Sequence, residues 1–180
     1  NLFSKLSKPL AERMRPKDLS FFIGQDNIIK NNSVLKNMIK NNRFSSMILY
    51  GPPGSGKTSL ANIISSTTDN YFVKISAVTS GTKEIKEIIE LAKDNLSMYN
   101  KRTILFIDEI HRFNKMQQDY LLEFVENGDI IFIGATTENP AYEVNNALLS
   151  RVIVFELQAL SFEHLKDIID NAILNDEILK

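Results

Sequence analysis

Short apolar runs alternate along the chain with longer segments in which apolar residues recur every three or four positions. Thr103–Ile107 is continuously apolar, which is typical of a central parallel strand that is covered on both faces. Four further runs have strand length, so we expect five strands, at 46–50, 71–76, 103–107, 129–134 and 152–155. Because helical segments separate these runs, the pattern predicts a three-layer α/β fold around a central parallel five-stranded sheet.

Helical periodicity marks the segments between the runs. Gly81–Asp94 carries apolar residues at the spacing i, i+3, i+4 and i+7, which is the stripe of an amphipathic helix. We expect further helices at 25–40, 58–64 and 114–127, and a last helix that starts after Ser161 as its N-cap. The residues expected to face inward in 114–127 are Met116, Leu121, Phe124 and Val125. The last helix carries a stripe of apolar residues, Leu165, Ile168, Ile169, Ala172 and Ile173.

One loop carries a complete phosphate-binding pattern, G-x-x-x-x-G-K-[ST]. It lies between a predicted strand and a predicted helix and consists of Gly51, Pro52, Pro53, Gly54, Ser55, Gly56, Lys57 and Thr58. The glycines let backbone N–H groups point at a β-phosphate, Lys57 reaches the β- and γ-phosphates, and the Thr58 hydroxyl binds Mg²⁺. Without a ligand we expect Lys57 to face solvent. The flanking strand and helix favour this interpretation over a chance glycine-rich turn.

An acidic pair, Asp108-Glu109, ends the most apolar of the predicted strands. Ligands of open α/β sheets bind at this edge, outside the carboxyl ends of the strands. Asp108 would hold Mg²⁺ opposite Thr58, and Glu109 would orient and polarise an attacking water as general base. Two acids can also merely end a strand. Their position 51 residues after Lys57 of the phosphate loop makes the catalytic interpretation the stronger one.

Two weaker features follow. The fourth predicted strand ends near Thr136 and Thr137, either of which could hydrogen-bond a γ-phosphate or the attacking water, although threonine is also common in ordinary loops. Arg151 ends a short helical turn before the last strand. An arginine there could stabilise charge on a transferring phosphoryl group, but a lone arginine is more often a surface residue.

The composition limits the kinds of partner and site that this chain can have. The net charge is −1, yet residues 1–50 carry nine Lys/Arg and three acids. That basic third could face nucleic acid, although on charge alone a solvated helical face is the favoured explanation.

The absence of cysteine excludes disulfides and thiolate metal sites, and two distant histidines do not make a zinc site. Apolar runs are far shorter than the roughly 20 residues that span a bilayer. Because Asn1 is not methionine and the last helix has no clear end, we expect a piece of a longer protein.

Taken in order, these motifs resemble those of the AAA+ ATPases and, more narrowly, of the replication-associated recombination protein A family. The strings that carry the resemblance cover nearly the whole chain: Pro9-Leu-Ala-Glu-Arg13-Met-Arg15-Pro16, Ile23-Gly24-Gln25, Ile75-Ser-Ala-Val-Thr-Ser80-Gly81, Asp108-Glu-Ile-His-Arg-Phe-Asn-Lys115 and Ile133-Gly-Ala-Thr-Thr-Glu-Asn-Pro140. The branch-migration motor RuvB has similar Arg-Pro, Ile-Gly-Gln and Asp-Glu-Ile-His-Arg strings. Clamp-loader subunits share the Arg-Pro, Gly-Gln and Ser-Arg elements.

The resemblance implies further roles. Residues that match the segment packing on adenine are Arg15, Pro16, Ile23 and Gly24. Thr137 matches the sensor threonine, with Thr136 as a close alternative, and Arg151 matches a finger that acts on ATP bound by the neighbouring subunit. Many relatives restrain the catalytic glutamate with an asparagine near the end of strand two, where this chain has Ser76. Residues 1–158 would form the AAA+ core and 159–180 the first helix of a lid domain.

The implied function is that of an Mg²⁺-dependent ATPase module acting in replication-fork maintenance, recombination or repair. The implied partners are single-stranded or fork-like DNA, further copies of the chain, and replication or repair proteins, with a nucleoid-associated cytoplasmic location and no membrane. We expect weak turnover from this chain alone, because no neighbouring finger reaches its site. The alternatives are a RuvB- or clamp-loader-like motor and a nucleotide-dependent assembly switch with little turnover. Intact Glu109 and Arg151 argue against a pure switch.

Overall fold

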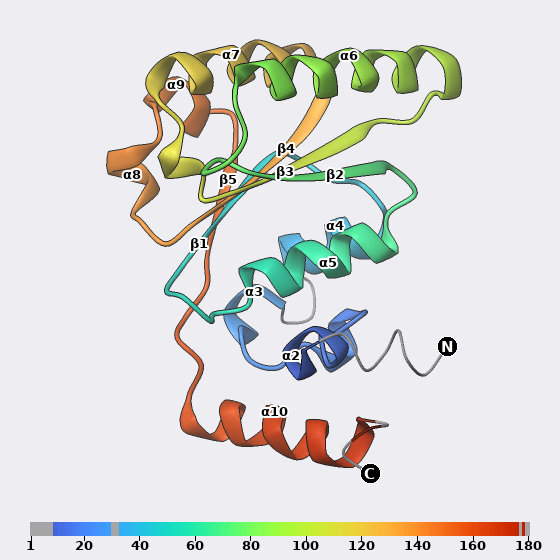
Figure 1. The fold of residues 1–180 in the computed structure, drawn as a ribbon, viewed down its shortest axis with the longest axis vertical. Helices are drawn as coiled ribbons and strands as arrows, with labels where there is room; N and C mark the ends of the chain where they lie inside the picture. The colour runs from blue at the N-terminus through green and yellow to red at the C-terminus, as the bar shows by residue number, and fades with distance from the viewer. Residues whose placement is uncertain (1–8, 30–32, 177, 179–180) are drawn as a thin grey trace.

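The chain folds around a five-stranded sheet in which every pair of neighbouring strands is parallel (Figure 1). The computed structural model describes residues 9–29, 33–176 and 178. The strand order is β2-β3-β4-β1-β5. The strands are β1 Met47–Tyr50, β2 Tyr71–Ser76, β3 Thr103–Asp108, β4 Ile130–Thr136 and β5 Ile153–Glu156. The predicted sheet is therefore confirmed, with β4 reaching two residues further than expected and ending on Thr136.

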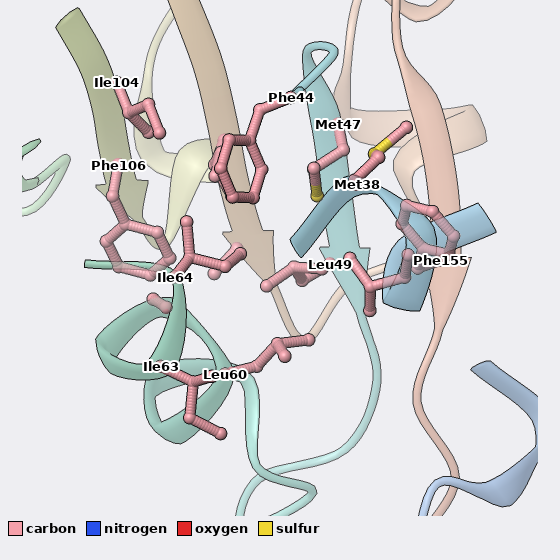
Figure 2. Close-up of a cluster of buried hydrophobic side chains, with 14 of the residues drawn as sticks. Met38, Phe44, Met47, Leu49, Leu60, Ile63, Ile64, Ile104, Phe106 and Phe155 are labelled. Atoms are coloured by element: carbon pink, nitrogen blue, oxygen red, sulfur yellow. The ribbon is translucent and has the colours of Figure 1, made fainter. Parts of the chain in front are cut away.

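Helices cover both faces of the sheet (Figure 1). One face is covered by α3 Asp26–Ile29, α4 Val34–Lys40 and α5 Lys57–Thr67, and the other by α6 Thr82–Tyr99 and α7 Lys115–Asn127. Side chains alternate along each strand, so adjacent Ile48 and Leu49 of β1 are both fully buried but in different apolar clusters. Figure 2 shows the cluster that packs Leu49 against Leu60 of α5. The predicted three-layer fold is confirmed.

Two of the sequence predictions about helices are wrong. The helix expected over 25–40 is not continuous among the described residues: α3 ends at Ile29, and α4 starts after Ser33, whose Oγ accepts a hydrogen bond from the N–H of Lys36 at 3.2 Å. Residues 30–32 lie outside the described structure. The serine is better used as an N-cap than inside a helix, because its side chain satisfies a free N–H at the helix start.

Met116 does not face inward, since 79% of its surface is exposed. It lies five positions before Leu121, which turns it well away from that buried residue at 100° per position. Gln118, three positions before Leu121, takes the inward place and is 2% exposed. Its amide nitrogen donates to the carbonyl oxygens of Phe113 and Glu143, both at 3.0 Å, so a polar side chain is buried at no cost in unpaired groups.

The last helix, α10 Phe162–Asn175, starts after Ser161 as predicted but does not pack on the sheet. It lies beside α2 Leu10–Arg13, below the layers of the core (Figure 1). Arg13 reaches Asp176 at its end through two hydrogen bonds of 2.9 and 3.0 Å. Of its predicted stripe only Ala172 is buried, while Leu165, Ile168, Ile169 and Ile173 stay exposed. None of the described helices is long and apolar enough to cross a bilayer.

Five short elements complete the described chain. They are the 3-10 turns η1 Leu19–Phe21 and η2 Ile110–Arg112, and the short helices α2, α8 Pro140–Glu143 and α9 Asn146–Leu149. η2 and α8 follow the carboxyl ends of β3 and β4, so they flank the edge of the sheet at which the phosphate loop also starts.

Candidate functional site

The phosphate loop joins the end of β1 to the start of α5. Its first residue is tied to the neighbouring strand, because Gly51 N–H donates to the carbonyl oxygen of Thr136 at 3.2 Å. Gly56 has a φ of 104° and forms the N-cap of α5, a conformation that a residue with a Cβ rarely adopts. Gly54, at φ +75°, has open space where a Cβ would point. The loop therefore opens onto the positive N-terminal end of α5.

Lys57 is turned into this loop rather than toward solvent, so the expectation of a solvent-facing lysine is wrong. Its side chain is 8% exposed, and Nζ donates to the carbonyl oxygens of Gly51 at 2.6 Å and Pro52 at 2.9 Å. Burial lowers the pKa of Lys57, and the charges of Glu109 and Asp108 partly oppose that shift. The acidic pair and the lysine therefore lie within electrostatic reach of one another.

The loop residues fit an anionic phosphate group. The ammonium of Lys57 is held by neutral carbonyl oxygens, which an anion can replace with a stronger charge-assisted partner. The Ser55 hydroxyl is buried and has no hydrogen-bond partner among the described residues. A buried hydroxyl without a partner is costly, so a further polar group in the loop would stabilise it. Thr58 follows in the first turn of α5 and is partly exposed.

The acidic pair lies where the sequence predicts it, at the carboxyl end of β3. Asp108 is the last residue of the strand, and its carbonyl oxygen accepts from the N–H of Ala77 at 2.9 Å. Glu109 adopts the left-handed conformation, with φ 57°, which is uncommon for a residue other than glycine and recurs at functional sites. Its carboxylate is 35% exposed and faces His111, with 3.3 Å between Oε2 and Nε2.

The two threonines differ in environment. Thr136 is fully buried at the end of β4, and its Oγ1 lies 2.9 Å from His111 Nδ1. The same oxygen accepts the N–H of Glu138 at 3.0 Å. Thr137 is partly exposed at the edge of the sheet. The choice between them as the sensor stays open, but only Thr136 is linked to the acidic pair through a side chain.

Ser76, which stands where relatives carry the restraining asparagine, is engaged locally. Its Oγ accepts the N–H of Val78 at 3.3 Å in the turn after β2. The register places Ser76 opposite Asp108. The carboxylate of Glu109 instead lies 3.3 Å from Nε2 of His111, a contact that the sequence did not predict.

The residues expected at adenine lie in two places. Arg15 and Pro16 line a hollow of about 370 Å³ over α5, together with Asn62 and Ser66. Ile23 and Gly24 lie further along, where the chain passes between the phosphate loop and the linker to α10. At Gly24 an added Cβ would meet Leu160 at 2.8 Å, so this glycine permits the close approach of the linker.

Gln25, for which sequence reasoning assigned no role, joins the phosphate loop to that linker. Its side chain is 4% exposed. Nε2 donates to the carbonyl oxygens of Ser55 at 2.9 Å and Gln158 at 2.7 Å, and Oε1 accepts the N–H of Gln158 at 2.7 Å. The only signal in the sequence was its place after Ile23-Gly24 in a recognised string.

Arg151 is not brought to the phosphate loop of its own chain. It precedes β5, so it lies at the amino edge of the parallel sheet, opposite the edge that carries the loop. Nη2 lies 3.0 Å from Glu126 Oε1 at the end of α7, and the arginine side chain is 51% exposed. It lines a hollow of about 580 Å³ that Arg102 also borders. The predicted finger therefore faces outward, away from its own site.

Comparison with known proteins agrees with this arrangement. Residues 47–158 match the model of the ATPase family associated with various cellular activities (AAA). The chain is 50% identical over 165 residues to replication-associated recombination protein A of Escherichia coli K12, covering 92% of this chain and 37% of that protein. It is also 50% identical over 169 residues to ATPase WRNIP1 of Dictyostelium discoideum, covering 94% of this chain and 19% of that protein. The predicted resemblance is confirmed.

Among solved structures, the RuvB Holliday junction branch migration motor of Thermotoga maritima is similar, with a TM-score of 0.72 and 34% identity. That match covers 89% of this chain and 54% of the motor. The chain thus spans only part of each protein it matches.

Proposed function

Since this chain belongs to the AAA family of ATPases, we propose that it binds ATP with Mg²⁺ and hydrolyses it to ADP and phosphate. The observation that supports this most directly is the placement of Lys57. Its buried ammonium lies in a glycine-lined loop at the start of a helix, within electrostatic reach of Asp108 and Glu109. This combination of one fixed cation, a helix N-terminus and two nearby carboxylates suits a polyphosphate bound with a divalent cation.

Metal binding, phosphate binding and activation of the water fall to different residues of the site. Thr58 and Asp108 would hold Mg²⁺, which neutralises charge on the phosphates when bound. Lys57 binds the β- and γ-phosphates in place of its present carbonyl partners. Glu109 orients a water and takes its proton as the water oxygen bonds to the γ-phosphorus. The bond from that phosphorus to the bridging oxygen then breaks, and ADP leaves with that electron pair.

Arg151 would complete the site of a neighbouring copy. It is exposed and lies at the opposite edge of the sheet from its own loop, which is the geometry that a finger acting between subunits needs. We therefore propose that the protein works as a homo-oligomer. The isolated chain would turn ATP over slowly, since no finger reaches its site.

The wider role follows from the relatives. The names of the similar proteins refer to replication-associated recombination and to Holliday junction branch migration. We propose that the protein acts at DNA, single-stranded or fork-like, in fork maintenance, recombination or repair, within the nucleoid region of the cytoplasm. The second candidate is a RuvB-like motor, which the structural likeness at 34% identity favours. A fork-dependent rise in phosphate release supports the first, and a rise specific to four-way junctions supports the second.

We also propose that the core ends at residue 158 and that 159–180 begin a lid domain. The exposed apolar side chains of α10 and its separation from the sheet support this division. Limited proteolysis of the full-length protein should then cut first near 159–161, after the residues that Gln25 and β1 hold. Cleavage within β4 or α5 ahead of that linker would contradict the division.

The catalytic assignment is tested with two variants and a matched control. Glu109→Gln should bind ATP with unchanged affinity and lose hydrolysis, because an amide cannot accept the proton of the water. Lys57→Ala should lose ATP binding. Glu123→Gln changes an exposed acid on the outer face of α7 in the same way and should behave like the parent. Equal phosphate release from parent and Glu109→Gln would remove Glu109 as the base.

The finger is tested by mixing. In the full-length protein Arg151→Ala should bind ATP without hydrolysing it. Each variant by itself, Arg151→Ala or Lys57→Ala, should therefore release no phosphate. Mixed oligomers of the two variants place a parental finger beside a parental phosphate loop at some interfaces, so part of the activity should return. No return of activity, in mixtures shown to exchange subunits, would contradict a finger that acts between subunits.

A further inference from the structure

His111 lies between Glu109, the proposed general base, and Thr136, one of the two candidate sensor threonines. It belongs to η2, directly after the acidic pair, and its side chain is 9% exposed. Nε2 is 3.3 Å from Glu109 Oε2, and Nδ1 is 2.9 Å from Thr136 Oγ1. One ring therefore connects the end of β3 to the end of β4.

The number of hydrogens on the ring determines which group donates and which accepts in each of these two contacts. In the tautomer that carries its one hydrogen on Nε2, that hydrogen faces the Glu109 carboxylate, which as an anion can only accept. Nδ1 must then accept, and the hydroxyl of Thr136 must donate to it. The tautomer is assigned from this network of partners, as is usual for histidine.

The Thr136 hydroxyl has a second acceptor within reach. Its oxygen lies 3.3 Å from the carbonyl oxygen of Glu138, against 2.9 Å from His111 Nδ1. It has a single hydrogen and cannot serve both. When the hydrogen is diverted from His111, Nδ1 loses its donor, the ring favours its other tautomer, and a bare Nε2 then faces the carboxylate. Two acceptors at that distance repel each other, so Glu109 is released.

We propose that His111 is the positioning residue that holds the Glu109 carboxylate. It couples the position of that carboxylate to the acceptor that the Thr136 hydroxyl donates to. The proposal rests on the proposed hydrolysis of ATP. It also explains how the glutamate is restrained in a chain whose Ser76 is engaged with Val78 instead.

The first test needs no hydrolysis. The chain has two histidines, His111 and His164, so long-range ¹H–¹⁵N NMR of the nucleotide-free protein can assign each ring, with His164 as internal reference. We expect His111 to carry its proton on Nε2 and to lose that preference in Thr136→Val and in Glu109→Gln. A ring protonated on Nδ1 alone or on both nitrogens, or one unaffected by both substitutions, would overturn the proposal.

The second test separates positioning from binding. The amide nitrogen of glutamine can reach roughly the place of Nε2, whereas asparagine reaches only the place of Nδ1. In the full-length protein His111→Asn should lower kcat by about 10- to 100-fold, as misplacement of a catalytic group does, with the ATP dissociation constant unchanged. His111→Gln should recover much of that loss. Arg112→Gln, an exposed neighbour in η2, should leave kcat within about twofold.

The third test measures coupling. If the two residues act as one unit, the Thr136→Val/His111→Asn double variant should lose no more kcat than the worse single variant. Losses that multiply, or a parental kcat in a folded His111→Asn, would contradict the proposal. The outcomes are distinguishable from failure of the proposed function. If Glu109→Gln kept its turnover while NMR showed the expected tautomer, hydrolysis by Glu109 would be wrong and the link to Thr136 would stand.

Discussion

Replacing Gln25 by methionine should destabilise the protein without changing the shape of its interior. Methionine has the same length and no branching, but it has neither the donor nor the acceptor of the amide. The glutamine is 4% exposed and makes three hydrogen bonds of 2.7 to 2.9 Å, all to backbone groups far away in the sequence. The substitution therefore removes all three bonds while leaving the apolar contacts in place.

The magnitude follows from the partners that are left behind. Each hydrogen bond contributes about 1 kcal/mol net, and a buried group left without a partner costs about 1 to 3 kcal/mol. The Ser55 carbonyl is the most enclosed of the three partners, whereas Gln158 is an exposed residue whose backbone groups water can reach. We expect a loss of about 3 kcal/mol in the free energy of unfolding, which is a drop of about 6 to 12 °C in Tm for a chain of this length.

Chemical denaturation followed by circular dichroism measures this loss. Gln158→Met is the matched control, because it makes the same chemical change at an exposed side chain and keeps the backbone N–H and carbonyl that Gln25 binds. The control should stay within about 0.5 kcal/mol of the parent. A Gln25→Met variant as stable as the control would refute the reasoning, and would mean that water replaces the amide at no cost.

Three other outcomes are expected. Gly134→Ala should lose about 1 to 3 kcal/mol of stability, because its Cβ would lie 2.7 Å from a buried phenylalanine ring, whereas Gly81→Ala meets no atom within 4 Å and should be near neutral in the same melts. The pKa of Asp18 lies below its ordinary value, chiefly because the Ser20 hydroxyl and then the Ser20 N–H donate to it, so Ser20→Ala should raise that pKa in a carboxyl ¹³C titration. That interaction is present above the ordinary pKa and is lost as pH falls through the lowered one, and an unmoved titration would contradict it. Burial lowers the pKa of Lys57, so ATP binding at alkaline pH should take up protons, seen as a buffer-dependent heat, and a heat independent of the buffer would contradict this.

The elements that the sequence predicted well are those whose signal is local. The central strands were visible because both faces of the sheet are covered there, which leaves runs such as Ile104–Ile107 without polar residues. The phosphate loop was visible because its backbone needs glycine at Gly54 and Gly56 wherever the chain folds this way. The N-cap at Ser161 was visible for a similar reason, since the serine acts on its own helix.

The features that the sequence did not predict depend on partners from elsewhere in the chain. The inward turn of Lys57 depends on carbonyl oxygens that only a curled loop presents. The role of His111 depends on the adjacent arrangement of β3 and β4, which brings Thr136 to it from 25 residues away. Gln25 meets Gln158 across 133 residues. Local patterns of polarity carry no information about such contacts, because the partners are distant in sequence and are brought together only by the fold of the whole chain.

The hydrogen bonds that join the N-terminal segment to the end of β5 and to the end of α10 have a consequence for protein synthesis. Residues 9–29 leave the ribosome before these distant partners: Asp176 follows Arg13 after 163 residues, and the Glu156 carbonyl follows Asn27 after 129 residues. All five strands, the last of which ends at Glu156, leave the ribosome before Asp176 does. The sheet and the phosphate loop thus emerge from the ribosome before the contact between Arg13 and Asp176 can form, and long-range closure of this kind is the slow part of folding. A nascent chain would hold a phosphate site before its N-terminal segment is joined to the end of α10.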